Sequence, residues 1–340
     1  SDWWNDSNDH EELQHAVNEG AVGATSNPVI TCAAVKNHPD VWLPVIDKMI
    51  ESNSTGSEDD ILWGLIDEVG KKAADILQPV YKKTHGQKGK LSLQVNPKYY
   101  RNSGLMFEQG KYLASLAPNI AVKCPALPAG IAALEKLTSN GICINATVSF
   151  TVAQAVAVAE AVERGLDEAE KNGFNIENLT PYVTIMVGRI DDHLKRINQS
   201  ENNEVEPEII DWASIAVFKN AYKIFQEKGY RSKLLAAAFR NHMHWSELVG
   251  GDIVISMPYE WWNKFNASDI EVINRINDPV DSEIIDKLSK NFNDFNRAFN
   301  EDGMTIEEFE FFGASKHTMD TFLNGYDEFI QIIRSRMINR

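Results

Sequence analysis

A lysine at the end of a short apolar run is the residue with the clearest chemical potential in this sequence. Lys123 follows residues 119–122 (NIAV) and precedes residues 124–126 (CPA), so its amine has apolar neighbours where lysine is uncommon. Burial disfavours the ammonium form and lowers the pKa, which leaves a neutral amine able to attack a carbonyl carbon and form a Schiff base. The alternative is a structural lysine that snorkels to the surface or pairs with a carboxylate.

Amide, hydroxyl and carboxyl groups stand near the ends of other apolar runs. Asn27 follows Thr25 and Ser26 at the end of the run GAVGAT. Asn145 and Thr147 end the run from residue 142, and Asp2 is placed at the end of a candidate first strand. If the ends of these strands meet at the mouth of a barrel, the two amides and the hydroxyl would suit the hydroxyl groups of a sugar. Asp2 could then accept a proton from one of the sugar hydroxyls. The structural alternatives are a turn residue before Pro28, a helix cap at Thr147 and an exposed carboxylate at Asp2.

Two arginines follow strand-like runs in the second half of the chain. Arg189 comes after residues 182–187 and Arg240 after residues 233–238, where barrels often bind the anionic group of a substrate. Alternatively, each arginine pairs with one of the many carboxylates. His242 and His244 follow closely, but two histidines at this spacing on a loop are a weak metal signal. The sequence therefore predicts an anion site, no metal and no cofactor.

These residues need a scaffold that brings strand ends together, and the chain predicts one. Short continuous apolar runs alternate with helical patterns, which is typical of parallel strands covered by helices. The predicted strands are residues 20–25, 91–95, 120–123, 142–146, 182–187, 233–238 and 252–256, with residues 2–4 as an eighth. Eight such strands predict an α/β fold, a (β/α)8 TIM barrel, in which functional residues lie at the carboxyl ends of strands.

The helices have recognisable starts. Ser57 with Asp60, and Thr151 with Gln154, are capping-box patterns that open long apolar-periodic segments, and residues 49–57 are the clearest loop. Residues 282–299 and 316–338 are predicted as extra C-terminal helices, the second of which could cover the barrel mouth or pack on a second subunit. We expect one domain over residues 1–340, with the barrel at about 1–260 and a helical appendage at about 261–340.

Composition excludes several classes of protein. The chain has 340 residues, 33 basic against 49 acidic, and a formal net charge of −16, so nucleic acid and membrane surfaces are poor partners. No apolar stretch approaches the roughly 18 residues that a membrane span requires. The three cysteines form no CxxC pair, which argues against disulfides and thiolate metal sites and favours the cytoplasm.

Taken together, five separated segments resemble the transaldolase family of class I aldolases. They are GATSNPVI at 23–30, AVKCPALPAGIAALEKL at 121–137, GICINATVSFTVAQAVAVAEA at 141–161, VGRIDD at 187–192 and AAFRN at 237–241. The resemblance covers most of residues 1–260. It implies a barrel enzyme that transfers a dihydroxyacetone unit from a ketose or ketose phosphate to an aldose without a cofactor.

The resemblance also implies roles for individual residues. Lys123 would form the Schiff base, and Asp2 would accept the proton whose loss drives carbon–carbon cleavage. Asn27 and Asn145 would bind hydroxyl groups of the substrate, and Thr147 would bind a water molecule. Arg189 and Arg240 would bind the anionic group of the substrate.

Three positions depart from the family pattern. Gln94 replaces a glutamate that relays protons, and an amide cannot do this near neutral pH, although the related fructose 6-phosphate aldolases also carry glutamine here. Those aldolases, however, use a strand tyrosine where this chain has Ile185 and Met186. Ala238 and Thr184 stand where serines are usual in the family. We therefore expect the end of the substrate that carries the anionic group to differ from that of the usual ketose phosphates. The alternatives are an aldolase that releases free dihydroxyacetone and a non-catalytic barrel that binds a sugar phosphate.

Overall fold

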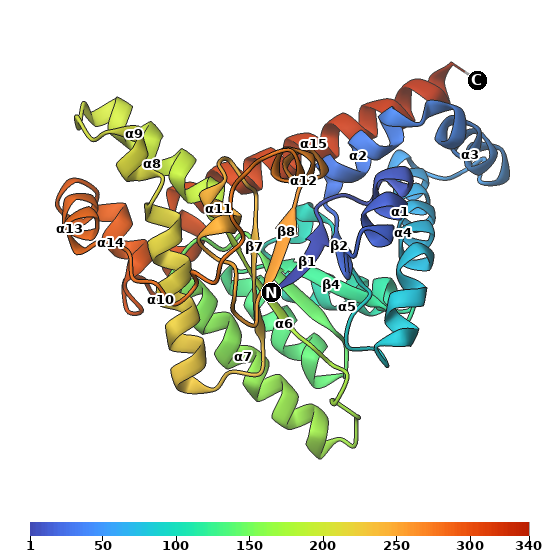
Figure 1. Cartoon of the computed structure of the whole chain (residues 1–340). Coiled ribbons are helices and arrows are strands. Elements are labelled where there is room, and N and C mark those ends of the chain that lie inside the picture. The colour runs from blue at the N-terminus through green and yellow to red at the C-terminus, as the bar shows by residue number, and fades with distance from the viewer. Residues whose placement is uncertain (340) are drawn as a thin grey trace.

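Eight parallel strands close into a barrel in which each strand pairs with its neighbours in chain order (Figure 1). The computed structural model describes residues 1–339. Each predicted run overlaps one observed strand, with ends that differ by up to three residues, and the predicted (β/α)8 barrel is confirmed. The strands are β1 (Asp2–Asn5), β2 (Gly23–Thr25), β3 (Lys90–Gln94), β4 (Ile120–Pro125), β5 (Ile144–Thr147), β6 (Tyr182–Met186), β7 (Lys233–Ala237) and β8 (Val254–Met257).

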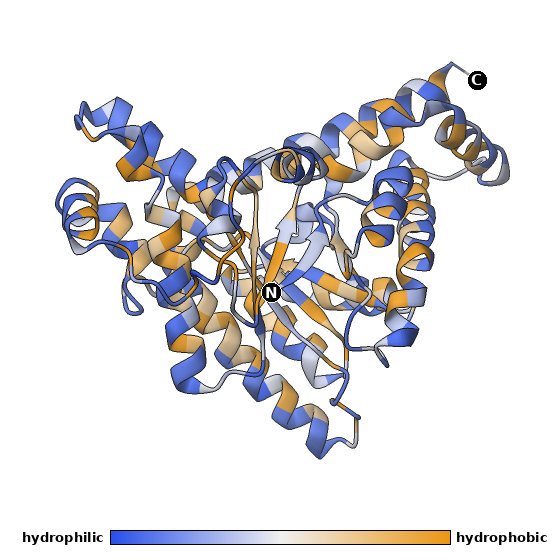
Figure 2. Ribbon diagram, in the orientation of Figure 1, coloured by the Kyte–Doolittle hydropathy of each residue, from blue (hydrophilic) through white to orange (hydrophobic). Residues whose placement is uncertain are grey.

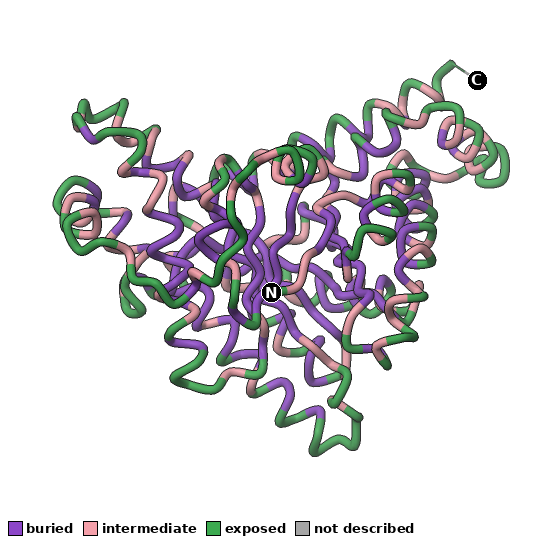
Figure 3. Tube along the Cα trace, viewed as in Figure 1, coloured by how far each residue is buried: buried purple, intermediate pink, exposed green. Residues whose placement is uncertain are grey.

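Helices connect the strands and cover the outside of the barrel. Hydrophobic segments concentrate around the strands, and the strands themselves are almost wholly buried (Figures 2 and 3). Up to β8 the helices are α1 (His10–Asn18), α2 (Pro28–Asn37), α3 (Pro39–Ser52), α4 (Glu58–Lys83), η1 (Pro97–Tyr99), α5 (Ser103–Ala114), α6 (Pro128–Ser139), α7 (Val152–Lys171), α8 (Val187–Glu201), α9 (Pro207–Ile210), α10 (Ala213–Lys228) and α11 (Met243–Ser246). None of the helices within residues 1–339 combines the length and apolar character that a bilayer crossing requires.

The predicted helix starts are present, with differences in detail. Ser57 and Asp60 form the reciprocal capping box of α4. Thr151 caps α7, but Gln154 accepts from the backbone N–H of Phe150 instead of completing a box. The predicted loop at 49–57 is wrong at its start, because α3 continues to Ser52 and only the residues from 53 to 57 connect it to α4.

Four α-helices and a 3₁₀ turn follow β8 in the described residues. They are α12 (Tyr259–Asn266), α13 (Ser282–Asn291), α14 (Asn293–Phe299), η2 (Ile306–Phe311) and α15 (Gly313–Ile338). The helix predicted at 282–299 is broken at Phe292, whose extended backbone separates α13 from α14 and whose side chain is buried.

The last helix, α15, returns to the first half of the barrel and lies across the end where the carboxyl ends of the strands meet (Figure 1). It packs against α2 and α4 and reaches α8. Its final turns are held by two arginines, Arg334 on Glu58 and Arg336 on Asp47, each with two nitrogens directed at one carboxylate. A segment far along the sequence thereby closes over the barrel.

Candidate active site

The carboxylate that enters the barrel mouth is Asp6, and the prediction of Asp2 is wrong. Asp2 is the first residue of β1, at the amino end of the barrel, where its carboxylate pairs with Lys88 at 2.6 Å and Lys233 at 3.6 Å. Asp6 directly follows β1 and lines the cavity that contains Lys123. The physical reason is direction: a parallel strand presents the residue after its apolar run to the active end, not the residue before it.

Lys123 lies within β4, is only 5% exposed and directs its amine into the cavity. Its Nζ donates to Oγ1 of Thr25 and to the backbone carbonyl oxygen of Ser26, both at 3.1 Å, and both partners come from the end of β2. These neutral acceptors position the amine without surrounding it with charge. The lysine is therefore held by hydrogen bonds of modest strength, and one face of its amine stays open to a ligand.

Burial shifts the pKa values of Lys123 and Asp6 in opposite directions. Desolvation lowers the pKa of Lys123 to about 8, against a smaller upward effect of the Asp6 charge. Desolvation likewise raises the pKa of Asp6 to about 6, against the downward effect of Lys123. Near neutral pH the pair therefore supplies a carboxylate able to accept a proton and a minor but substantial fraction of neutral amine.

A cavity of about 210 Å³ connects these two groups with the ends of other strands. Its wall includes Thr25, Asn27, Thr147, Thr184, Met186, Arg189 and Arg240, together with apolar side chains. Thr321 and Phe322 of α15 complete the wall. The site therefore combines residues from strands spread around the barrel with a cover from the end of the chain.

Two of the predicted residues, Asn145 and Gln94, lie beside Lys123 on the neighbouring strands but are not part of the cavity wall. They are the register partners of Lys123 on the two neighbouring strands, so the three side chains point to the same side of the sheet. The Asn145 amide donates to Oγ of Ser92 at 2.9 Å and accepts from the Thr184 hydroxyl at 2.8 Å. Oε1 of Gln94 is buried without a hydrogen-bond partner.

Asn27 and Thr147 do line the cavity, and each also has a structural contact. Oδ1 of Asn27 caps α2 by accepting from the backbone N–H of Ile30 at 2.9 Å, which agrees with its place before Pro28. The hydroxyl of Thr147 points to the sulfur of Met186 at 3.7 Å. Since a thioether is a weak acceptor, this hydroxyl can be recruited by a ligand or a water molecule at little cost.

The two predicted arginines meet at one side of the mouth. Arg189, in the first turn of α8, makes no ion pair within residues 1–339, and its Nε is buried without a partner. Burial and the neighbouring charge of Arg240 lower the pKa of Arg189. Two adjacent guanidinium groups, one of them unpaired, make a site that an anion would stabilise.

Arg240 is already partly engaged. Its side chain contacts Oδ2 of Asp192 at 3.0 Å and donates to the backbone carbonyl oxygens of Ala238 and Phe239. Ala238 adopts a left-handed conformation with φ of 65°, so that its carbonyl also accepts from the backbone N–H of Gly188 at 3.1 Å. A Cβ on Gly188 would lie 2.1 Å from that carbonyl oxygen, so only glycine permits this approach.

A buried polar network supports Arg240 from behind. His244 accepts from the backbone N–H of Arg240 through Nδ1 at 2.9 Å, and its Nε2 lies 2.8 Å from Oδ2 of Asp191. Asp191 also accepts from the backbone N–H and the hydroxyl of Ser214. The side chains of His244 and Asp191 are fully buried, so this network is structural rather than open to substrate.

Sequence reasoning missed Asp6, Asp192 and the α15 residues Thr321 and Phe322. Asp6 could have been found from the apolar pair before it, because strand direction places the following residue at the active end. No local signal identifies Thr321 and Phe322, since their place depends on where α15 docks.

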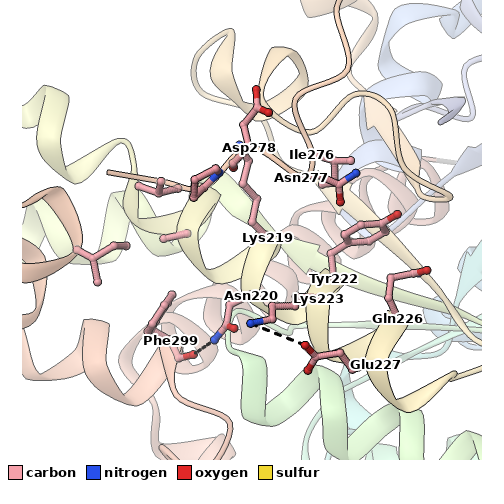
Figure 4. A pocket seen from close by; sticks show the side chains of 14 residues that line it. Lys219, Asn220, Tyr222, Lys223, Gln226, Glu227, Ile276, Asn277, Asp278 and Phe299 are labelled. Carbon is pink, nitrogen blue, oxygen red and sulfur yellow. Dashed lines mark hydrogen bonds and ion pairs between the residues drawn. The ribbon is translucent and has the colours of Figure 1, made fainter. Parts of the chain in front are cut away.

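A further cavity, of about 520 Å³, lies outside the barrel along α10 and is shown in Figure 4. Two of its polar side chains are engaged in internal contacts: Lys219 binds Glu247 and the carbonyl oxygen of Asp278, and Asn220 donates to the carbonyl oxygen of Phe299. This cavity contains none of the predicted site residues.

A parallel eight-stranded barrel with its ionisable groups at the carboxyl ends of the strands has the architecture of the (β/α)8-barrel enzymes. The sequence profile of the Transaldolase/Fructose-6-phosphate aldolase family matches residues 3–311. The chain belongs to this family.

Individual relatives carry the same family name at modest identity. A transaldolase of Saccharopolyspora erythraea is 30% identical over 223 residues, which are 64% of this chain and 58% of the relative. Transaldolase 1 of Streptomyces avermitilis is 28% identical over 222 residues, again 64% of this chain and 58% of the relative. A transaldolase of Thiobacillus denitrificans is 28% identical over 211 residues, or 62% and 58%. The match thus spans less than two thirds of these relatives.

Proposed function

We propose that this chain is a transaldolase-like transferase that moves a dihydroxyacetone unit from a ketose or ketose phosphate to an aldose through a Schiff base on Lys123. The observation that carries the proposal is the buried amine of Lys123, with its pKa lowered to about 8, in one cavity with Asp6. Family membership supports the same reaction class.

The proposed reaction begins when neutral Lys123 attacks the ketone carbon of the donor and water leaves, forming a protonated imine. Asp6 then accepts the proton of the hydroxyl on the far side of the bond to be cleaved. That oxygen forms a carbonyl, the carbon–carbon bond breaks, and its electron pair moves into the imine to give an enamine. The aldose leaves, and the enamine carbon attacks the carbonyl carbon of an acceptor aldehyde while protonated Asp6 returns its proton to the oxygen of that carbonyl. Hydrolysis of the resulting imine then releases the new ketose and restores Lys123.

The other cavity residues fit a short, hydroxylated substrate with an anionic end. Asn27, Thr147 and Thr184 offer an amide and two hydroxyls near Lys123, and Arg189 with Arg240 offers positive charge at the rim. The cavity of about 210 Å³ favours a short carbon chain over a large ligand. Asn145 and Gln94, outside the cavity wall, would act by fixing the hydroxyl of Thr184 and the polarity around Lys123.

Gln94 favours a second candidate, aldol cleavage to free dihydroxyacetone. Its amide lies beside Lys123 in the register of β3 and β4, where a carboxyl group would relay protons to water. Without this relay, the balance changes between transfer of the enamine carbon to an aldehyde and its protonation to an imine that water then hydrolyses. Turnover that requires an aldose acceptor supports the transferase, and equal turnover without an acceptor supports the aldolase.

Borohydride trapping tests the shared step of both candidates. The protein is incubated with dihydroxyacetone or fructose 6-phosphate, reduced, digested and mapped by peptide mass spectrometry. A three-carbon adduct on Lys123 is expected, and it should be lost in Lys123→Met but kept in Lys90→Met, which removes another buried lysine outside the cavity. Sugar binding by the wild-type protein without an adduct would instead favour a non-catalytic barrel.

A further inference from the structure

We propose that Asp9, His10 and His38 form a binding site for a divalent transition metal of the zinc class, outside the sugar cavity. Asp9 and His10 lie where the loop after β1 enters α1, and His38 lies at the junction of α2 and α3. None of the three lines the cavity around Lys123. The proposal does not depend on the reaction assigned to that cavity.

The three side chains converge from two separate segments of the chain. One potential ligand atom from each lies within 4.8 Å of the others. Nε2 of His38 is 2.8 Å from Oδ2 of Asp9, and the rings of His10 and His38 have centroids 4.5 Å apart. Small rotations of these side chains would place three ligand atoms around one ion at the distances of about 2.0 to 2.2 Å that zinc requires.

The surroundings orient these ligands as metal sites usually do. Oδ1 of Asp9 accepts from the backbone N–H groups of Glu11 at 3.0 Å and Glu12 at 3.2 Å, which leaves Oδ2 directed at the histidines. Nδ1 of His38 lies 4.0 Å from Oε1 of Glu11, so a carboxylate stands behind the ligand imidazole. At 4.0 Å the contact is longer than a hydrogen bond, and its shortening on metal binding would fix the ring and increase its basicity.

His10 supplies the observation that points to a missing ligand. Its Nδ1 is buried without a hydrogen-bond partner, which is a cost that a bound ion would remove.

The donor set defines the class of ion. Two imidazoles and one carboxylate suit zinc, cobalt, nickel or copper, whereas magnesium and calcium prefer oxygen ligands. Three protein ligands leave at least one position for water. A bound ion would link the loop that follows Asp6 to the α2–α3 junction, in addition to the contact of the Asn8 amide with the Thr31 hydroxyl at 3.0 Å.

Metal binding is measured directly on the full chain, without sugar present. The metal-free protein is titrated with Zn²⁺ by calorimetry and with Co²⁺ by visible absorption, and one ion per chain is expected to bind. The His10→Ala variant removes one proposed ligand. Within residues 1–339 the His10 side chain makes no hydrogen bond, so the variant breaks none and keeps the Asp9–His38 contact. Its affinity should fall by at least about tenfold.

His317→Ala is the matched control, since it removes an exposed histidine elsewhere, and its affinity should equal that of the wild type. Melting temperature gives a second readout: Zn²⁺ should raise it in the wild type and in His317→Ala, and less in His10→Ala. Absence of saturable binding to the wild type, or equal binding to His10→Ala, would overturn the proposal and leave Asp9 and His38 as an ion pair that joins α1 to α3.

Discussion

The backbone N–H of Arg240 donates to Nδ1 of His244 over 2.9 Å, and this contact fixes the tautomer of a fully buried histidine. Because Nδ1 accepts, the ring proton is on Nε2, which donates to Asp191. The imidazole is therefore a neutral spacer between a buried carboxylate and the backbone of a cavity arginine. His244 is fully buried and does not line the cavity, so we expect it to act by positioning Arg240.

Replacing His244 tests this positioning role. His244→Leu leaves Asp191 and the Arg240 N–H without their partner, so we expect a loss of stability of about 1 to 3 kcal/mol and a higher KM for phosphorylated donors. His244→Asn can still accept from Arg240 and should restore part of the KM. Thermal melts and donor titrations check both effects; an unchanged KM in a folded His244→Leu protein would contradict the role.

The structure places Asp6, and not the predicted Asp2, in the cavity with Lys123, so we compare two separate substitutions, one at each aspartate. Asp6→Asn should reduce turnover by about 10²- to 10⁴-fold while the borohydride adduct on Lys123 still forms, because the base acts after imine formation. Asp2→Asn removes only contacts at the opposite end of the barrel and should leave kcat nearly unchanged. Steady-state assays with mass spectrometry of the trapped protein distinguish the two.

The pKa of Lys123 predicts how adduct formation depends on pH. Below a pKa of about 8 the amine is protonated and cannot attack, so the rate of trapping should increase with pH and level off above about 8. The Asp6 charge raises this pKa, so in Asp6→Asn the whole profile should move to lower pH. A profile centred near the ordinary lysine pKa of 10.5 would show that the amine is not desolvated.

The arginines are expected to discriminate by substrate charge. Arg189→Met should raise KM for a phosphorylated ketose by about tenfold or more, because a charged hydrogen bond contributes roughly 1.5 to 3 kcal/mol. It should have little effect on dihydroxyacetone, which has no anionic end. Arg240→Met should have the smaller effect, since Asp192 already neutralises part of that charge. Parallel KM measurements with both donors decide the matter.

The strands were predictable because continuous apolar runs are the signature of a sheet buried on both faces. Lys123, Arg189 and Arg240 were predictable for a related reason, since each of the three stands near the carboxyl end of such a run and lines the cavity at the barrel mouth. The same rule applied to the wrong end of β1 produced Asp2 in place of Asp6. The break at Phe292 left no signal of the kind that proline or glycine provides.

Long-range docking limits what the sequence can tell. Nothing near Thr321 or Phe322 reveals that α15 crosses to α2 and brings both residues to the mouth. Asp191 on α8 and His244 on α11 are likewise 53 residues apart, and they meet because both helices pack against α10 and β7.

The pairing of β1 with β8 has a consequence for how the molecule forms. Asp2 lies opposite Val254 in register, so the ring of strands closes through contacts between residues about as distant along the chain as this barrel allows. Such contacts form only after a long segment of chain has been closed into a loop, and they stabilise the fold only then. This requirement slows folding. During synthesis β1 must wait for most of the chain to emerge, with Trp3 and Trp4 exposed in the interval. We therefore expect the barrel to close slowly and the incomplete chain to be prone to aggregation. Binding of chaperones to the nascent chain would reveal both properties.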